Sequence, residues 1–191
     1  MLVKFTESII DDFKIPSFEI NEGEILILKI PGGTKFQGLV KKICEHIKDK
    51  NPTFTYVEHH NSRTFLERIF PLTVRRYLKN SDLNSESIQK IGEAHFLNPD
   101  MKFQNLGGTS RRKISLFKTL SYTKNIMIDL VGVDPKGGIE IYGILKENMR
   151  NKGSVILFDH FNEFQDDCSK FIEVEYTGMP NGETLLKHEG D

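Results

Sequence analysis

The residues whose types and spacing most clearly suggest a binding site lie in a short glycine-rich loop between an apolar segment and a helix. Residues 23–30 predict a strand, Pro31–Thr34 a turn, and the residues from Lys35 onward a helix. Backbone N–H groups in such a loop, together with the helix dipole, form a cradle for an anion such as phosphate. Nucleotide chemistry adds a lysine on the phosphates and a Ser or Thr hydroxyl on Mg²⁺. Those two places hold Phe36 and Gln37, so the loop keeps the backbone of a phosphate site without its side chains.

The composition of the chain limits the settings in which such a loop would work. The 191 residues suffice for one domain or for one domain with a subdomain. The formal net charge of −1 gives no attraction to nucleic acid, which is therefore not an expected partner. Basic clusters such as Arg111–Lys113 are interpreted as solvated helix faces. No apolar run approaches the ~18 residues that span a bilayer, and the two cysteines favour a reducing compartment. We expect a cytoplasmic protein, with any attachment to the inner membrane made through a partner.

Apolar runs and turn residues predict an α/β fold with a mainly parallel sheet and flanking helices. The expected strands cover residues 2–5, 18–20, 25–30, 54–57, 126–131, 154–158 and 171–176, with a turn at residues 14–16. The expected helices begin near residue 35, cover the region from 65 to 91, and then span 111–120 and 138–149. The middle helices form an insertion, and residues 179–191 are expected to be a loose tail.

In order and spacing, these segments resemble the ATP-binding cassette (ABC) ATPases, the nucleotide-binding subunits of ABC transporters. The resemblance runs from about Ser17 to Val174. A single short motif matches by chance, so the order of the motifs carries the resemblance. The matching segments are 17–25 before the phosphate loop, 31–33 in it, 56–59 at the glutamine loop, 69–78 at the start of the helical subdomain, 106–113 at the signature motif, 132–135 at the D-loop, and His160 at the switch histidine.

The resemblance implies a single nucleotide-binding domain over residues 1–191, with a P-loop NTPase-like sheet, a helical subdomain at about 60–120 and a reduced antiparallel β-subdomain. It implies Mg-ATP as cofactor. Asp129 would support Mg²⁺ at a strand end, His160 would sense the γ-phosphate, and Phe5 is the candidate for stacking on adenine. By position in the motifs, the nucleotide-binding residues would be Gly32, Gly33, Thr34, Lys35, Phe36, Gln37, His59, Gly108, Ser110 and Asp134.

Departures from the family pattern fall on the same chemistry. Phe36 brings no charge to a phosphate and Gln37 brings no hydroxyl to Mg²⁺. Lys35 stands one residue too early, so its side chain should leave the loop in a different direction. Leu130 occupies the place of the catalytic Glu. The remaining departures are His59 at the glutamine position, and Thr109 and Ser110 in the signature motif.

Three functional hypotheses follow from this pattern. The leading one is a degenerate ABC-type subunit, ATPase-deficient and hence not an enzyme, with a structural or regulatory role in a transporter. Its partners would be a membrane permease subunit, a second nucleotide-binding subunit, or both, in a homo- or heterodimer. The second is an active ATPase in which Lys35 reaches the phosphates and Asp134 or Asp159 serves the attacking water. The third is a free-standing protein- or anion-binding module on the same fold.

Purely structural roles remain open for the same residues. The loop Pro31–Lys35 could be a turn that only packs the strand on the helix. Asp129 could be a buried capping carboxylate, and His160 a hydrogen-bonded histidine at a strand end.

Overall fold

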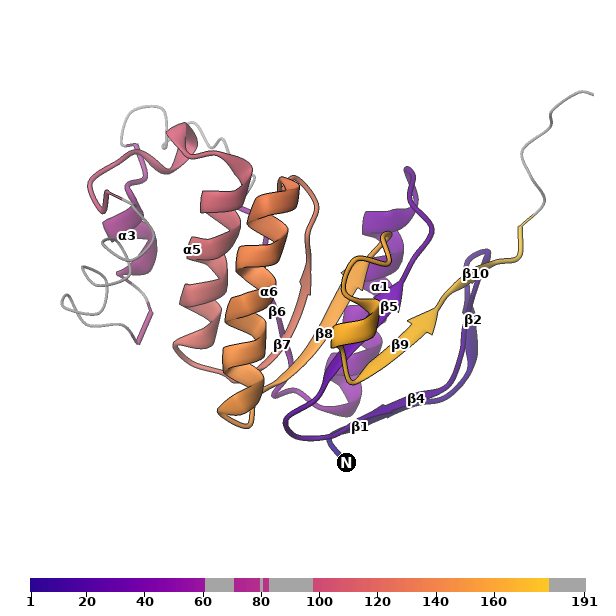
Figure 1. The fold of residues 1–191 in the computed structure, drawn as a ribbon. Helices are drawn as coiled ribbons and strands as arrows, with labels where there is room; N and C mark the ends of the chain where they lie inside the picture. Colours follow the sequence, from indigo (N-terminus) through magenta and orange to yellow (C-terminus); the bar gives the residue numbers. More distant parts are fainter. Residues whose placement is uncertain (61–70, 80, 83–97, 179–191) are drawn as a thin grey trace, which may run out of the picture.

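A five-stranded parallel sheet forms the centre of the molecule (Figure 1). The computed structural model describes residues 1–60, 71–79, 81–82 and 98–178. Every neighbouring pair in the sheet is parallel, which confirms the predicted α/β fold. The central strands are almost wholly buried because both faces of the sheet are covered. In spatial order the strands are β6 (Thr55–Tyr56), β7 (Asn125–Asp129), β8 (Ser154–Asp159), β5 (Ile25–Lys29) and β9 (Lys170–Glu173).

Side chains of the central strands alternate between two apolar layers. On β5, Leu26 and Leu28 belong to the layer that contains the buried face of α1 (Phe36–Lys50). Ile25 and Ile27 belong to the layer shared with α5 (Gly108–Leu120) and α6 (Pro135–Arg150). Because successive residues of a strand point to opposite faces, α1 covers one face, while α5 and α6 lie side by side on the other, as Figure 1 shows.

Two small antiparallel sheets flank this core and form the expected antiparallel part of the fold. In one, β1 (Val3–Phe5) pairs with β4 (Phe18–Ile20). In the other, β3 (Phe13–Ile15) pairs with both β2 (Ser8–Ile10) and β10 (Glu175–Tyr176). The turn predicted at residues 14–16 is wrong in position, because the chain turns at Asp11 and Asp12, and Asp11 has a positive φ of 52°.

Phe5 is unavailable for stacking on adenine, so that expectation is wrong. Its side chain is fully buried on β1 and its ring stacks on that of Phe18, with centroids 4.8 Å apart. The aromatic residue belongs to the core between the antiparallel pair and α1.

The segment between β6 and α5 contains two short helices in its described part. They are α3 (Val74–Leu78), whose N-cap Thr73 accepts a hydrogen bond from Arg76 N, and the 3₁₀ helix η1 (Phe103–Asn105). Both pack on the first half of α5 in a separate apolar cluster around Ile114. Much of the helix predicted over residues 65–91 lies outside the described residues, as does the expected tail at 179–191.

Several element boundaries differ from the predicted ones for identifiable reasons. β7 ends at Asp129, because the carboxylate accepts a hydrogen bond from Val131 N at 2.9 Å and turns the chain. α6 begins at Pro135, three residues earlier than predicted, because Asp134 caps it by accepting from Gly137 N at 2.9 Å. α5 likewise begins at Gly108. The last predicted strand is divided into β9 and β10.

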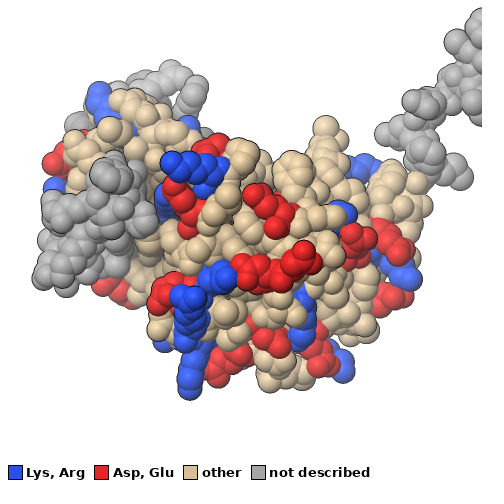
Figure 2. All heavy atoms as spheres, viewed as in Figure 1, with Lys and Arg blue, Asp and Glu red and all other residues tan. Residues whose placement is uncertain are grey.

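Neither cysteine forms a disulfide: Cys44 is buried on α1, and Cys168 is partly exposed just before β9. No helix of the described residues is long and apolar enough to cross a membrane. On the face drawn in Figure 2, basic and acidic side chains are intermingled.

Candidate functional site

The residues predicted to bind nucleotide gather at the carboxyl end of the parallel sheet. The glycine loop follows β5, Asp129 ends β7, and His160 follows β8. Because the strands are parallel, these three ends meet at one edge, which is where open α/β sheets bind ligands.

The loop between β5 and α1 retains an exposed backbone. Pro31, Gly32, Gly33, Thr34 and Lys35 are all exposed. Gly33 has a φ of 125°, a conformation that side chains disfavour. The N-terminus of α1 has no capping side chain and no acidic residue in its first turn. The loop therefore still presents N–H groups at the positive end of a helix.

Phe36 occupies the position of the phosphate lysine and packs into the core. Its side chain is 5% exposed and belongs to the apolar layer beneath α1. Its ring lies edge-on to that of His160, with centroids 6.1 Å apart. Gln37, at the position of the Mg²⁺ ligand, is exposed. Phe36 therefore contributes apolar packing and no charge.

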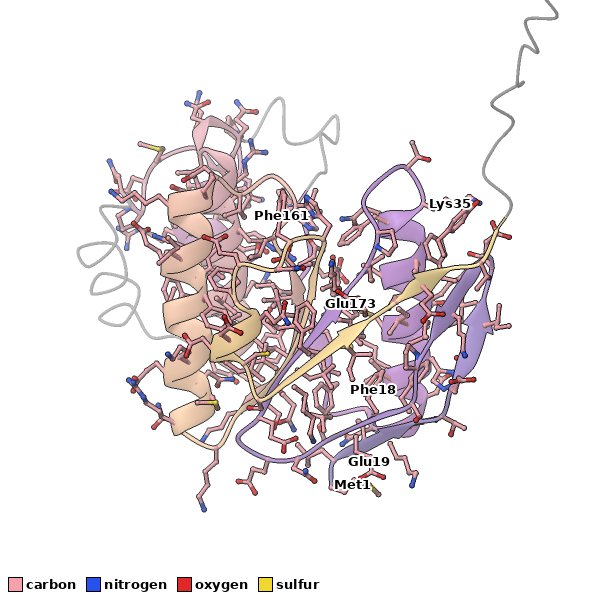
Figure 3. The ribbon with its side chains drawn as sticks, turned by 45° about the vertical axis from the view of Figure 1, so that its right-hand side comes forward. Met1, Phe18, Glu19, Lys35, Phe161 and Glu173 are labelled. Atoms are coloured by element: carbon pink, nitrogen blue, oxygen red, sulfur yellow. The ribbon has the colours of Figure 1, made fainter. Side chains whose placement is uncertain are left out.

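Lys35 turns away from the loop toward the antiparallel strands. Its ammonium donates to the carboxylate of Asp12 in the turn between β2 and β3, and lies 5.4 Å from the ring centroid of Tyr176. The hydrogen bond to Asp12 is the main reason that the pKa of Lys35 is raised. Figure 3 shows Lys35 and Phe161 at the same end of the molecule, with Lys35 on the side of β10.

Asp129 is the centre of a buried polar cluster. Tyr56 donates its hydroxyl hydrogen to Oδ2, and His59 Nε2 lies 2.8 Å from Oδ1. Since a carboxylate only accepts hydrogen bonds, Nε2 of His59 carries the proton. Arg112 Nη2 completes the cluster as an ion pair at 3.3 Å. Burial alone would raise the pKa of Asp129, but the His59 hydrogen bond and the charge of Arg112 outweigh it and lower the pKa to about 2.

Arg112 and Tyr56 are the two members of this cluster that sequence reasoning missed. Arg112 is 3% exposed, and it donates from Nε to the carbonyl of Asp129 at 2.9 Å and from Nη1 to the carbonyl of Val57 at 2.7 Å. The interpretation of Arg111–Lys113 as a solvated face is wrong for Arg112 and for Lys113, which is 7% exposed and pairs with Glu140. The run of three basic residues gave no local signal that separates the buried Arg112 from the partly exposed Arg111.

The signature-like and D-loop-like segments pack against each other within this one chain. Thr109 donates its hydroxyl hydrogen to the carboxylate of Asp134, which is the main reason that the pKa of Asp134 is lowered. A Cβ atom added to Gly108 would overlap the carbonyl oxygen of Gly132, so only glycine fits there. Ser110 is partly exposed beside them. Asp134 thus serves as a helix cap and a partner of Thr109.

His160 lies at the surface immediately after β8. Its side chain is 40% exposed and packs against the rings of Phe161, at a centroid distance of 3.9 Å, and Phe36. Asp159, the last residue of β8, accepts from the backbone N–H of His160 at 2.7 Å. Burial raises the pKa of Asp159.

A cavity of about 660 Å³ opens between α5 and the strand ends. The glycine loop itself does not line it among the described residues. No group of three or more His, Cys, Asp or Glu side chains in the described residues is arranged to hold a metal ion. The cavity is lined by Gln37, Glu58, His59, His60, Gly108, Arg111, Arg112, Ser115, Val131 and Gly132.

Comparison with known proteins establishes the fold. Neither a protein-family model nor a curated protein matches the sequence. A solved structure from Pyrococcus furiosus, described as an ABC transporter ATP-binding protein, matches with a TM-score of 0.66 and 16% identity, over 90% of this chain and 94% of that one. A nucleotide-free ATP-binding cassette from an ABC transporter matches with a TM-score of 0.62 and 15% identity, over 88% and 86%. A dimeric bacterial ABC transporter cassette matches with a TM-score of 0.57 and 14% identity, over 86% and 90%.

Proposed function

We propose that this chain, which has the fold of an ABC transporter ATP-binding cassette, is a degenerate, ATPase-deficient subunit with a structural or regulatory role in a transporter complex. The observation that carries the proposal is the environment of Asp129, whose buried carboxylate is held by Tyr56, His59 and Arg112. A carboxylate that supports Mg²⁺ needs an oxygen directed at the metal or its water. A guanidinium 3.3 Å from Oδ2 repels a divalent cation from that place.

The side chains of the glycine loop do not fit Mg-ATP either. Phe36 is packed into the core, Gln37 lacks a hydroxyl, and Lys35 is paired with Asp12. Phosphate binding in such loops depends on a lysine and a metal ligand as well as on the backbone. The remaining contribution is the exposed backbone of residues 31–35.

The retained parts are those that give the molecule its shape. The parallel sheet, the capped start of α6 and the packing of Gly108 on Gly132 all persist, while charged side chains at the loop are replaced or paired. This asymmetry supports a role in docking, with the chemistry supplied by another subunit. The proposed partners are a membrane permease subunit and a second nucleotide-binding subunit; one matching structure is itself a dimeric cassette.

Two measurements test the proposal together. Purified protein mixed with its candidate cassette or permease should co-elute in size-exclusion chromatography, and millimolar Mg-ATP should leave its thermal transition unchanged. A ligand at ~100 times its Kd adds about 2.7 kcal/mol of stability, so real binding would be visible. Separate elution from every candidate would overturn the docking role.

A saturable Mg-ATP shift would instead favour an active nucleotide-binding subunit. Two observations favour this second candidate, an active subunit: the start of α1 has no capping side chain, and the backbone of the loop is exposed. Separate elution together with no response to ATP would favour a free-standing module.

A further inference from the structure

The cavity beside α5 contains an arginine whose charge has no partner in the described residues. The side chain of Arg111 makes one hydrogen bond within the described residues, from Nε to the carbonyl of Leu106 at 2.9 Å, which leaves both terminal nitrogens of its guanidinium available. No carboxylate of the described ranges forms an ion pair with it. Its two neighbours differ, because Arg112 pairs with Asp129 and Lys113 with Glu140.

The position of Arg111 at the start of a helix favours a negative charge beside it. α5 begins with Gly107 as N-cap, without a capping side chain and without an acidic residue in its first turn. Positive side chains at the positive end of a helix are unfavourable unless a negative charge lies nearby. The carboxylate of Asp134 reaches the first turn of α5 at Thr109 but forms no ion pair with Arg111. A further anion beside the guanidinium of Arg111 would therefore be stabilised by both the side chain and the helix start.

A second arginine, Arg112, belongs to the wall of the same cavity. Arg112 lines it and is 3% exposed, yet its Nη2 atom has no hydrogen-bond partner in the described part of the chain and only the ion-pair contact of 3.3 Å with Asp129. Buried donors normally have a partner, and an unsatisfied one lowers stability. Gln37, His59 and Ser115 add polar groups to the walls, and Glu58 lies at an exposed position.

We propose that this cavity binds a compact anion, such as a phosphate group carried by a small molecule, at the guanidinium of Arg111 and beside Nη2 of Arg112. Guanidinium groups hold phosphates by paired, charge-assisted hydrogen bonds. The volume of about 660 Å³ leaves room for more than inorganic phosphate. The site is formed within one chain, without Mg²⁺ and without the loop at residues 31–35. It goes beyond the proposed function, which assigns no ligand, so either can fail without the other.

Inorganic phosphate is the first probe, titrated by calorimetry without Mg²⁺ and against sodium chloride of equal ionic strength. The wild-type protein should bind phosphate saturably. Arg111→Gln should weaken binding by about ten- to a hundredfold, because a charge-assisted hydrogen bond is lost. A phosphorylated small molecule such as ribose 5-phosphate, tested in parallel, should bind at least as tightly as phosphate if the free volume is used, and more weakly if inorganic phosphate is the ligand.

Three variants locate the site. Arg150→Gln removes an equal charge from the exposed end of α6 and should leave the affinity unchanged, as should Lys35→Ala in the glycine loop. Gln37→Glu, an exposed substitution that α1 should tolerate in its first turn, should weaken binding even if Arg111→Gln fails to fold. Absence of saturable phosphate binding, or wild-type affinity in Gln37→Glu and Arg111→Gln, or loss of binding in Lys35→Ala, would overturn the proposal.

Discussion

Arg112 Nε lies 2.9 Å from the carbonyl oxygen of Asp129, so a buried guanidinium fastens α5 to the end of β7. The same group reaches Val57 after β6 through Nη1 at 2.7 Å. One arginine therefore links a helix and two strand ends, and it neutralises the carboxylate beside the glycine loop. The polar cluster at the carboxyl edge of the sheet is therefore structural, because Arg112 is the cation that pairs with Asp129.

Arg112→Ala should lower the free energy of unfolding by about 3–5 kcal/mol, because it leaves a buried carboxylate unpaired and two backbone carbonyls without a donor. Urea denaturation measures the change. Arg150→Ala, in an exposed pair with Glu147, should change stability by less than about 1 kcal/mol. Equal effects of the two variants would refute a special role for Arg112.

Stability should fall in acid as Asp129 takes up a proton. Its pKa is lowered from the ordinary 3.8 to about 2 in the folded protein, so the unfolded chain binds the proton more tightly. The contribution, about 2 kcal/mol, is fully present above about pH 4 and is lost as the pH falls toward 2. Urea titrations at several pH values measure it. In Asp129→Asn the free energy of unfolding should fall by about 2 kcal/mol less between pH 4 and pH 2 than in the wild type. The same dependence of this free energy on pH in both proteins would count against the prediction.

Gly108→Ala should destabilise the protein by about 1–3 kcal/mol, because the new Cβ overlaps the carbonyl oxygen of Gly132 and forces the two segments apart. Gly143→Ala is the matched control in α6, where a Cβ meets nothing within 4 Å. It should stabilise the protein by up to about 1 kcal/mol through helix propensity. Thermal unfolding of both variants gives the comparison, and a neutral Gly108→Ala would show that the contact relaxes.

Phe36→Ala should cost about 3–5 kcal/mol, since it opens a cavity in the layer under α1. Phe36→Leu keeps most of the apolar volume and should cost roughly half as much or less. Chemical denaturation distinguishes them. A small effect of Phe36→Ala would mean that the ring contributes little to the stability of the fold, and would refute a packing role for Phe36.

Lys35→Ala and Asp12→Ala should each change stability by less than about 1 kcal/mol, because both side chains of the pair are about half exposed. The small effect should shrink further in added salt. A loss of several kcal/mol in either variant, measured by urea denaturation, would identify the pair as a structural tether of the glycine loop.

The parallel sheet was predictable because its strands are short apolar runs between turn residues. Residues 154–158 and 126–128 are almost wholly apolar runs of the kind found in strands that are covered on both faces of a sheet. The resemblance to ABC cassettes is confirmed in the fold. The hairpin of β2 and β3 was missed because each strand has three residues and the turn contains Asp11 and Asp12 without a glycine. Local sequence offers little signal for elements that short.

The candidate site was predictable in position and not in its contacts. The motif order placed the loop, Asp129 and His160 at one edge, because parallel strands share their carboxyl ends. The burial of Arg112 depends on a carboxylate 17 residues away and on the packing of α5, neither of which a run of three basic residues reveals. The roles assigned to individual residues in nucleotide binding stay predictions.

The difference in burial between the two cysteines offers a site for a covalent fluorescent label. Burial raises the pKa of both thiols, and far more for Cys44, which lies inside the layer under α1. A thiol-directed fluorophore should therefore react first at Cys168, just before β9 and thus at the amino end of the sheet. The label would lie at the opposite end of the sheet from the candidate site. Fluorescence anisotropy could therefore follow binding of a partner subunit to the native sequence, without an engineered cysteine.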